Sequence, residues 1–160
     1  MTRSNARELA IHLVYELGFH NQTAEELLEQ ELSRETFELR SADEPLYAEY
    51  PNEKQRIYIE TLVRGVSEHS AELDDYISRL SIGWKFSRLP RVAVAIMRVA
   101  MYEVLYMPDV PNAAAVNEAV ELAKGYEDPE MVSFLNGILG TFIRQELPQD
   151  SKAPEGEQPQ

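Results

Sequence analysis

Residues 84–142 decide the fold of this chain and read WKFSRLPRVAVAIMRVAMYEVLYMPDVPNAAAVNEAVELAKGYEDPEMVSFLNGILGTF. Two joints divide this stretch, MPDVP at 107–111 and YEDP at 126–129. Proline is disfavoured inside a helix and favoured at its first turn, so these joints mark where helices end and begin. The stretch therefore predicts three successive helices, and we expect the rest of the chain to support or extend them.

The three predicted helices differ in how apolar they are. The first keeps a helical period with Val92, Ala95, Ile96, Val99, Ala100 and Tyr106, and almost every side of it is apolar. Such a helix is expected at the centre of a core. The second carries a stripe of small residues suited to close helix packing. The third begins at Asp128 as N-cap and forms the stripe Met131, Phe134, Leu135, Ile138 and Phe142.

Four further helical patterns precede this stretch. The opening one has Ala6, Leu9, Ala10, Leu13, Val14 and Leu17 at helical spacing. A capping-box pattern at Thr23 and Glu26 begins the second, Asn52 begins the third, and Leu73 to Leu80 form a short fourth. The sequence thus predicts an all-α protein of about seven helices. We expect one domain over residues 1–147 and a disordered tail over 148–160, where proline is frequent and apolar residues are rare.

Composition excludes several classes of function. With 28 acidic and 15 basic residues the formal charge is −13, which disfavours broad, sequence-independent binding to nucleic acid. The absence of cysteine rules out disulfides, thiolate nucleophiles and cysteine metal sites. No signal-peptide pattern and no membrane-spanning apolar run occurs, so we expect a cytoplasmic protein without membrane contact.

The acidity is concentrated between residues 21 and 53. This window holds ten carboxylates, at positions 25, 26, 29, 31, 35, 38, 43, 44, 49 and 53, against Arg34 and Arg40, a net charge of 2 − 10 = −8. No chemistry in the sequence requires these acids. We interpret them as a solvated, charge-repelling face.

Patterns for catalysis or metal binding are weak. His12, His20 and His69 are far apart and match no helical metal motif. The string GVSEH at 65–69 lacks the closing glycine of a nucleophile elbow, and GILG at 137–140 lies in an apolar helical stripe. We therefore expect no catalytic residue, no metal and no cofactor, and hence no enzyme.

Charged side chains on the apolar helices predict a structural ion pair. Arg98 is expected to pair with Glu103 or with Glu118, because charges on such helices are partly buried and need a partner. A second group lies off the apolar stripe of the opening helix. Arg3 and Arg7 are one turn apart there, and Tyr15 lies about 80° around the helix from Arg7. From spacing alone this group fits either a solvated surface or a binding face.

Several segments closely resemble the NusB family of transcription antitermination factors. They are RLPRVAVAIMRVAMYEV, DVP, VNEAVELAK and FLNGIL, in order and with the expected gaps, and RSNARELAIHLVY near the N-terminus. The likeness covers most of residues 3–142 but not 33–53 or the tail. It implies two small helical bundles, an N-terminal one of about three helices and a C-terminal one of about four, and no enzyme activity.

The resemblance also implies partners and site residues. Such proteins pair with NusE, a ribosomal protein, and together bind boxA-type single-stranded RNA of nascent ribosomal transcripts in the antitermination complex of RNA polymerase. By position, the RNA contacts fall on Arg3, Arg7, Tyr15 and Phe134, and the NusE surface on Trp84, Arg88, Leu89 and Ala93. Cations with aromatic rings are the usual means of holding single-stranded RNA. Phe134 also fits the apolar core stripe, and the free protein is a candidate homodimer.

Two positions depart from the family pattern. Ser4 and Asn5 stand where arginines are usual, which predicts weak RNA binding with a shallow salt dependence, and Ala93 replaces a common acidic residue. These departures leave a second function open, a NusB-like adaptor that binds proteins and has little RNA affinity. A third, the RNA-recognition domain of a ribosomal RNA methyltransferase, is disfavoured because the sequence contains no cofactor-binding domain.

Overall fold

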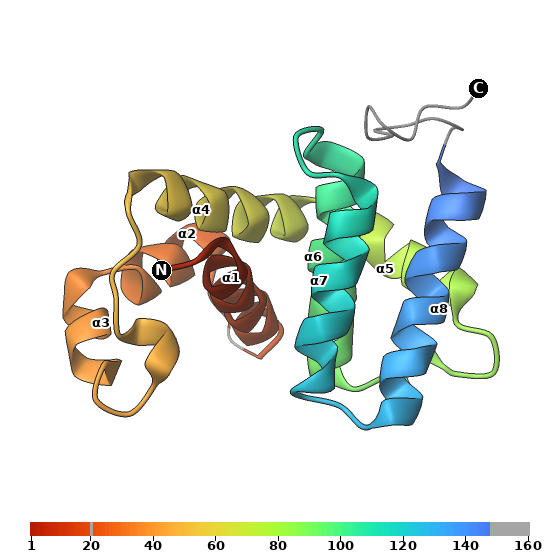
Figure 1. Cartoon of the computed structure of the whole chain (residues 1–160), viewed down its shortest axis with the longest axis horizontal. Helices are drawn as coiled ribbons and strands as arrows, with labels where there is room; N and C mark the ends of the chain where they lie inside the picture. The colour runs from red at the N-terminus through yellow and green to blue at the C-terminus, as the bar shows by residue number, and fades with distance from the viewer. Residues whose placement is uncertain (20, 148–160) are drawn as a thin grey trace. The chain divides into compact units, whose positions relative to one another are not determined.

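The computed structural model describes residues 1–19 and 21–147, and within these ranges all regular structure is helical (Figure 1). The chain divides into two compact units, one spanning Met1–Glu68 and one beginning at His69. The first unit holds α1 (Arg3–Leu17), α2 (Ala24–Glu31), α3 (Arg34–Arg40), the 3-10 turn η1 (Pro45–Tyr47) and α4 (Glu53–Glu68). The second holds α5 (Ser70–Leu80), the 3-10 turn η2 (Phe86–Arg88), α6 (Arg91–Tyr106), α7 (Asn112–Lys124) and α8 (Pro129–Glu146). The predicted all-α class is confirmed.

The first unit is built on the contact between α1 and α4, with α2 packed against both. Its fully buried side chains include Leu9, Leu13, Leu27, Ile59 and Leu62. The capping box predicted at the start of α2 is present: the Thr23 hydroxyl accepts from the Glu26 amide, and the Glu26 carboxylate accepts from the Thr23 amide. The apolar stripe of the opening helix therefore forms the core of this unit.

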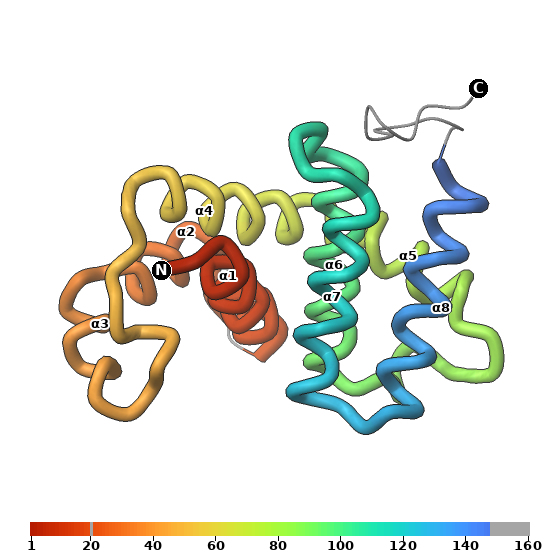
Figure 2. Tube along the Cα trace, in the orientation of Figure 1, coloured from red at the N-terminus to blue at the C-terminus, as the bar shows by residue number. Residues whose placement is uncertain are grey.

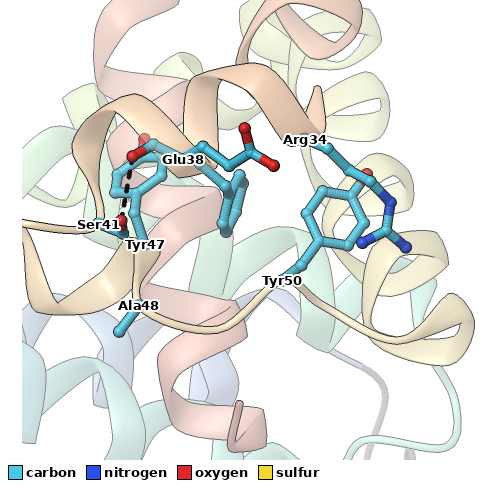
Figure 3. A pocket seen from close by; sticks show the side chains of 7 residues that line it. Arg34, Glu38, Ser41, Tyr47, Ala48 and Tyr50 are labelled. Carbon is cyan, nitrogen blue, oxygen red and sulfur yellow. Dashed lines mark hydrogen bonds between the residues drawn. The ribbon is translucent and has the colours of Figure 1, made fainter.

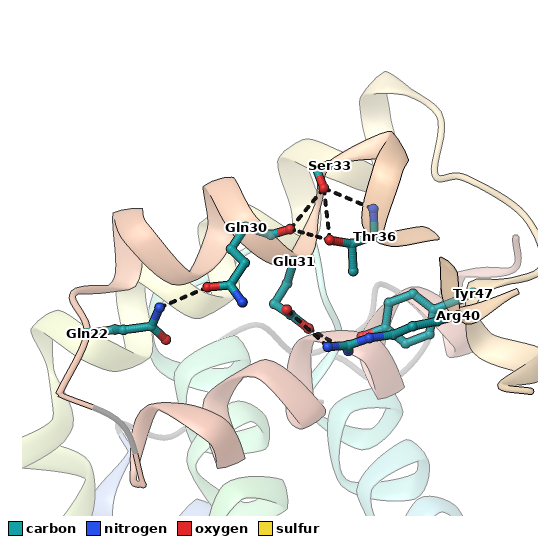
Figure 4. Close-up of polar contacts among 7 residues, drawn as sticks. All are labelled: Gln22, Gln30, Glu31, Ser33, Thr36, Arg40 and Tyr47. Carbon is teal, nitrogen blue, oxygen red and sulfur yellow. Dashed lines mark hydrogen bonds and ion pairs between the residues drawn. The ribbon is translucent and has the colours of Figure 1, made fainter. Parts of the chain in front are cut away.

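The described part of this unit has four α-helices where the sequence predicted about three. The predicted second helix ends at Glu31, and a new one begins after Ser33, whose hydroxyl accepts from the Thr36 amide at 3.1 Å. The Ser33 and Thr36 hydroxyls also donate to the Gln30 carbonyl at 3.0 and 2.8 Å (Figure 4). Serine and threonine offer such local hydrogen bonds in competition with a continuous helix, which explains the break.

The second unit is organised around α6. This helix contacts α5, α7 and α8 and buries ten of its residues, which include five in succession from Ala93 to Met97. Figure 2 shows α6, α7 and α8 as neighbouring helices of this unit. Asp128 caps α8 through the Met131 amide at 2.9 Å, with Pro129 at the first helical position, as predicted. The central place predicted for the most apolar helix is confirmed.

No helix in the described ranges is long and apolar enough to cross a membrane. The predicted disordered tail, 148–160, lies outside the described residues. A single domain over 1–147 concerns how the two units combine, and it stays a prediction.

Candidate functional site

The candidate site on the first unit begins at the N-terminus of α1. Thr2 caps this helix by accepting from the Asn5 amide at 3.0 Å, and the Gln55 side chain of α4 donates to the Met1 carbonyl. These contacts hold the first turn of α1 beside the beginning of α4. The guanidinium groups predicted to contact RNA are thus carried by a fixed helix end.

Both predicted arginines lie near the ring of Tyr58 on α4. The Arg3 guanidinium carbon is 3.7 Å from the ring centroid, and that of Arg7 is 5.7 Å away. Arg3 is exposed, whereas Arg7 is only 4% exposed. Arg3 is therefore accessible to a ligand, whereas Arg7 is buried beside the same ring, and the RNA role of both stays a prediction.

Tyr58 was missed as a site residue in the sequence, where it reads as part of the apolar stripe of its helix. It is buried, yet its ring face receives a cation, which only the packing of α1 on α4 reveals. Lys54 is exposed and lies one turn before Tyr58 on α4, so it adds positive charge on the same side of that helix. The part of this group that the sequence shows is Tyr58 one turn after Lys54 on a helix. The packing of α1 on α4 places that pair beside Arg3 and Arg7.

Tyr15 lies near the other end of α1. Twelve residues separate it from Arg3, which corresponds to about 18 Å along a helix and about 120° around it. Its half-buried ring is 4.8 Å from the ring of Phe19. The structure therefore brings Arg3 and Arg7 together but places Tyr15 about three turns away.

Phe134 belongs to α8, in the second unit. It is half-buried, unlike its neighbours Met131 and Leu135, which are buried. Its ring centroid is 5.4 Å from that of Trp84, which is 40% exposed. The core interpretation of Phe134 is weakened because part of its ring remains accessible, and its RNA role stays a prediction.

The residues predicted for partner binding fall into two groups. Trp84 and Arg88 are exposed, and Trp84 follows Gly83, whose φ of +85° is a conformation that favours glycine. Leu89 and Ala93 are 4% and 0% exposed, so they support the surface from beneath. The partner role of these four residues stays a prediction.

Arg98, which is predicted to form a structural ion pair, pairs with a residue outside the predicted candidates. Arg98 donates to both carboxylate oxygens of Asp74 on α5, at 2.7 and 2.8 Å. Asp74 was not among the candidates in the sequence, because a partner 24 residues away cannot be read from helical spacing. Glu103 is fully buried and Glu118 is half-buried, and the role predicted for these two glutamates stays a prediction.

The described residues include no group of three or more histidine or acidic side chains arranged to hold a metal ion. His12 is half-buried on α1, and burial lowers the pKa of its imidazole, while Glu8 and Glu44 oppose the shift. A neutral histidine of this kind adds no charge at neutral pH to the surface formed by Arg3, Arg7 and Tyr58, which we call the Arg3 face.

Comparison with known proteins places the chain in a family. Residues 4–144 match the model of the NusB family. Proteins named transcription antitermination protein NusB are similar over most of their length: the one from Acetivibrio thermocellus is 40% identical, with 92% of each chain covered. The one from Carboxydothermus hydrogenoformans is also 40% identical, with 88% of this chain and 91% of that protein covered.

Solved structures support the fold. NusB of T. maritima aligns with a TM-score of 0.68 at 24% identity, covering 94% of this chain and 96% of that one. A chain in the crystal structure of a plectonemic RNA supercoil aligns with a TM-score of 0.74 at 22% identity, covering 92% and 98%. From the family match and the 40% identical relatives, this chain belongs to the NusB family.

Proposed function

We propose that this chain is a transcription antitermination factor that binds boxA-type RNA together with NusE in the antitermination complex of RNA polymerase. The relatives' shared name supports the antitermination role. The observation that carries the RNA part is the exposed Arg3 guanidinium held 3.7 Å from the Tyr58 ring centroid. The cytoplasmic location expected from the sequence is part of this proposal, since the factor acts on nascent RNA.

The Arg3 face suits single-stranded RNA because it combines a cation with rigid support. A guanidinium over an aromatic face gains attraction from the ring and loses less freedom when it meets a phosphate. Ser4 and Asn5 add no charge to this turn, and the whole chain carries −13. Binding by this chain alone should therefore be weak, and NusE is expected to supply the remaining affinity.

Binding of a boxA RNA oligonucleotide, measured by fluorescence anisotropy with and without NusE at several salt concentrations, tests the proposal. Arg3→Ala should weaken RNA binding about three- to tenfold at low salt and reduce the salt slope by about one. Arg144→Ala removes the same charge from an exposed position on α8 and serves as the matched control. Equal losses for the two variants would contradict the Arg3 face.

The role of Tyr58 is positioning, and it has its own test. Tyr58→Leu should reduce RNA binding nearly as much as Arg3→Ala, whereas Tyr58→Phe keeps the ring face and should retain binding. Thermal unfolding of both variants separates this effect from a loss of fold.

The adaptor function remains the second candidate, because Arg7 is buried and the first turn lacks further arginines. Under that function NusE binds but does not increase RNA affinity. If adding NusE leaves boxA affinity unchanged at low salt, the adaptor replaces the RNA-binding factor as the conclusion.

A further inference from the structure

The segment around α3 and η1 contains a hollow of about 180 Å³ (Figure 3). We name it the α3 pocket; its walls include Arg34, Phe37, Glu38, Tyr47, Ala48 and Tyr50. The three rings pack on one another, with the Phe37 centroid 4.7 Å from that of Tyr47 and 5.0 Å from that of Tyr50. The pocket is thus a concave site with aromatic walls.

The frame of the α3 pocket is held by polar contacts beneath the rings. Glu31 is 1% exposed and accepts from both terminal nitrogens of Arg40, at 2.6 and 3.3 Å, and Arg40 also donates to the Tyr47 hydroxyl at 3.1 Å (Figure 4). The Tyr50 hydroxyl donates to the Leu32 carbonyl at 2.5 Å. These contacts fix Tyr47 and Tyr50, so the pocket is formed before any partner arrives.

The aromatic faces of this pocket already accept guanidinium groups from the chain itself. The Arg34 guanidinium carbon is 4.3 Å from the Tyr50 centroid, and that of Arg40 is 5.2 Å from the Tyr47 centroid. Attraction between a cation and a ring face is the common feature of both contacts. Phe37 is 4% and Tyr47 2% exposed, so a guanidinium from outside would reach the half-buried Tyr50 ring of this pocket.

Charge selects the class of partner. Glu38 lines the pocket, and its exposed carboxylate makes no ion pair within the described residues. Residues 21–53 carry a net charge of 2 − 10 = −8, and both arginines of that window are already placed over rings. Such a surface repels RNA and attracts a basic protein segment.

We propose that the α3 pocket binds a basic segment of a partner protein, with an arginine side chain of that segment lying against Tyr50 and Glu38. Tyr50 also lines a second hollow of about 360 Å³, whose charged walls are Glu25, Glu29, Glu60, Arg56 and Arg64. Arg64 already pairs with Glu25 and Glu60. The charge of this second hollow is therefore mixed, and the cation of a partner is expected in the α3 pocket alone. This site is separate from the Arg3 face and goes beyond the function proposed above.

The test uses the full chain, ¹⁵N-labelled, titrated with the peptide Ac-Gly-Ser-Arg-Gly-Arg-Ser-Gly-NH2 and followed by amide chemical shifts. We expect the largest shifts within residues 34–50. The same peptide with both arginines replaced by glutamine should bind at least about threefold more weakly. Shifts elsewhere in the chain, or equal binding of the two peptides, would overturn the proposal.

Two pairs of variants localise the binding. Glu38→Gln and Glu35→Gln remove the same charge from exposed positions on α3, but only Glu38 lines the pocket. Ala48→Leu fills the pocket, whereas Ala42→Leu adds the same volume at an exposed position outside it. Glu38→Gln and Ala48→Leu should each weaken arginine-peptide binding at least about threefold, with their controls unchanged.

Two further outcomes would overturn the proposed site or the proposed class of partner. Equal affinities within either pair of variants overturn the site. Displacement of the peptide by a 12-nucleotide single-stranded RNA would favour a nucleic-acid site and overturn the protein partner. Because the readout needs neither boxA RNA nor NusE, failure here is distinct from failure of the proposed function.

Discussion

The two units of this protein contain similar ion pairs whose carboxylates differ strongly in exposure. In the first unit, Arg40 pairs with Glu31, whose side chain is 2% exposed. In the second, Arg98 pairs with Asp74, whose side chain is 30% exposed. Both pairs use two guanidinium nitrogens on one carboxylate. The arginines follow the opposite order, with 33% exposure for Arg40 and 17% for Arg98, so the two pairs differ in the burial of the carboxylate and not of the whole pair.

The difference follows from how each unit is built. In the first unit, α2 and α3 have eight and seven residues, and helices this short are marginal without tertiary contacts. The Glu31–Arg40–Tyr47 contacts tie both helices to η1. The second unit has the 16-residue α6, which is held by apolar burial on nearly all sides. The Glu31–Arg40 pair therefore holds short helices together in the first unit. The Asp74–Arg98 pair adds to a second unit that apolar burial already stabilises.

Arg40→Met should produce the largest effect on stability. The substitution leaves the Glu31 carboxylate buried without its cation, which typically costs about 3–5 kcal/mol. Urea unfolding at pH 7 measures the loss.

Arg34→Met is the matched control for this variant. Arg34 is exposed on the same helix and contacts only a ring face in the described structure, so its loss should cost about 1 kcal/mol or less. Equal destabilisation by the two substitutions would show that the ion pair does not hold this unit together.

Arg98→Met should cost less, about 1–2 kcal/mol. The Asp74 carboxylate is partly exposed and can be solvated when its partner is lost, which reduces the penalty. A double-mutant cycle with Asp74→Ala isolates the interaction from the packing of the two side chains. If Arg98→Met lowers the free energy of unfolding as much as Arg40→Met does, burial of the carboxylate does not explain the difference between the two units.

The helical class and the order of the helices could be predicted because they rest on local patterns. The period of residues 92–106 placed α6 at the centre of its unit, and Asp128 with Pro129 marked the start of α8. The break between α2 and α3 was missed, since the hydroxyls of Ser33 and Thr36 decide it through contacts with the Gln30 carbonyl. The spacing of apolar residues carries no information about such hydrogen bonds.

The candidate site was predictable only in part, because it depends on which helices meet. Arg3 and Arg7 could be grouped from their spacing, but Tyr58 joins them only through the packing of α4 on α1. Asp74 and the α3 pocket likewise bring together residues that no local pattern links. Long-range pairing is the information that one sequence without relatives does not carry.

Alkaline pH should have the smallest effect on stability. It again compares a buried group of the first unit with a more exposed group of the second. Burial and the Glu31 carboxylate raise the pKa of Tyr47 to about 12, against an opposing effect of Arg40. In the second unit, the hydrogen bond to Glu72 and burial raise the pKa of Tyr106 to about 12. A raised folded-state pKa contributes stability below pH 10, and this contribution is lost as the pH rises towards 12.

Urea midpoints between pH 9 and pH 11 should therefore fall for the unmodified chain, with Tyr47 accounting for about 1 kcal/mol at pH 11. Tyr47→Phe should lower stability at pH 9, because the hydrogen bond to Arg40 is lost, but should flatten the dependence on pH. Tyr106→Phe should flatten it less, because Tyr106 is 39% exposed and Tyr47 is 2% exposed. If Tyr106→Phe flattens the pH dependence of stability more than Tyr47→Phe does, the greater burial of Tyr47 does not determine how strongly its ionisation lowers stability.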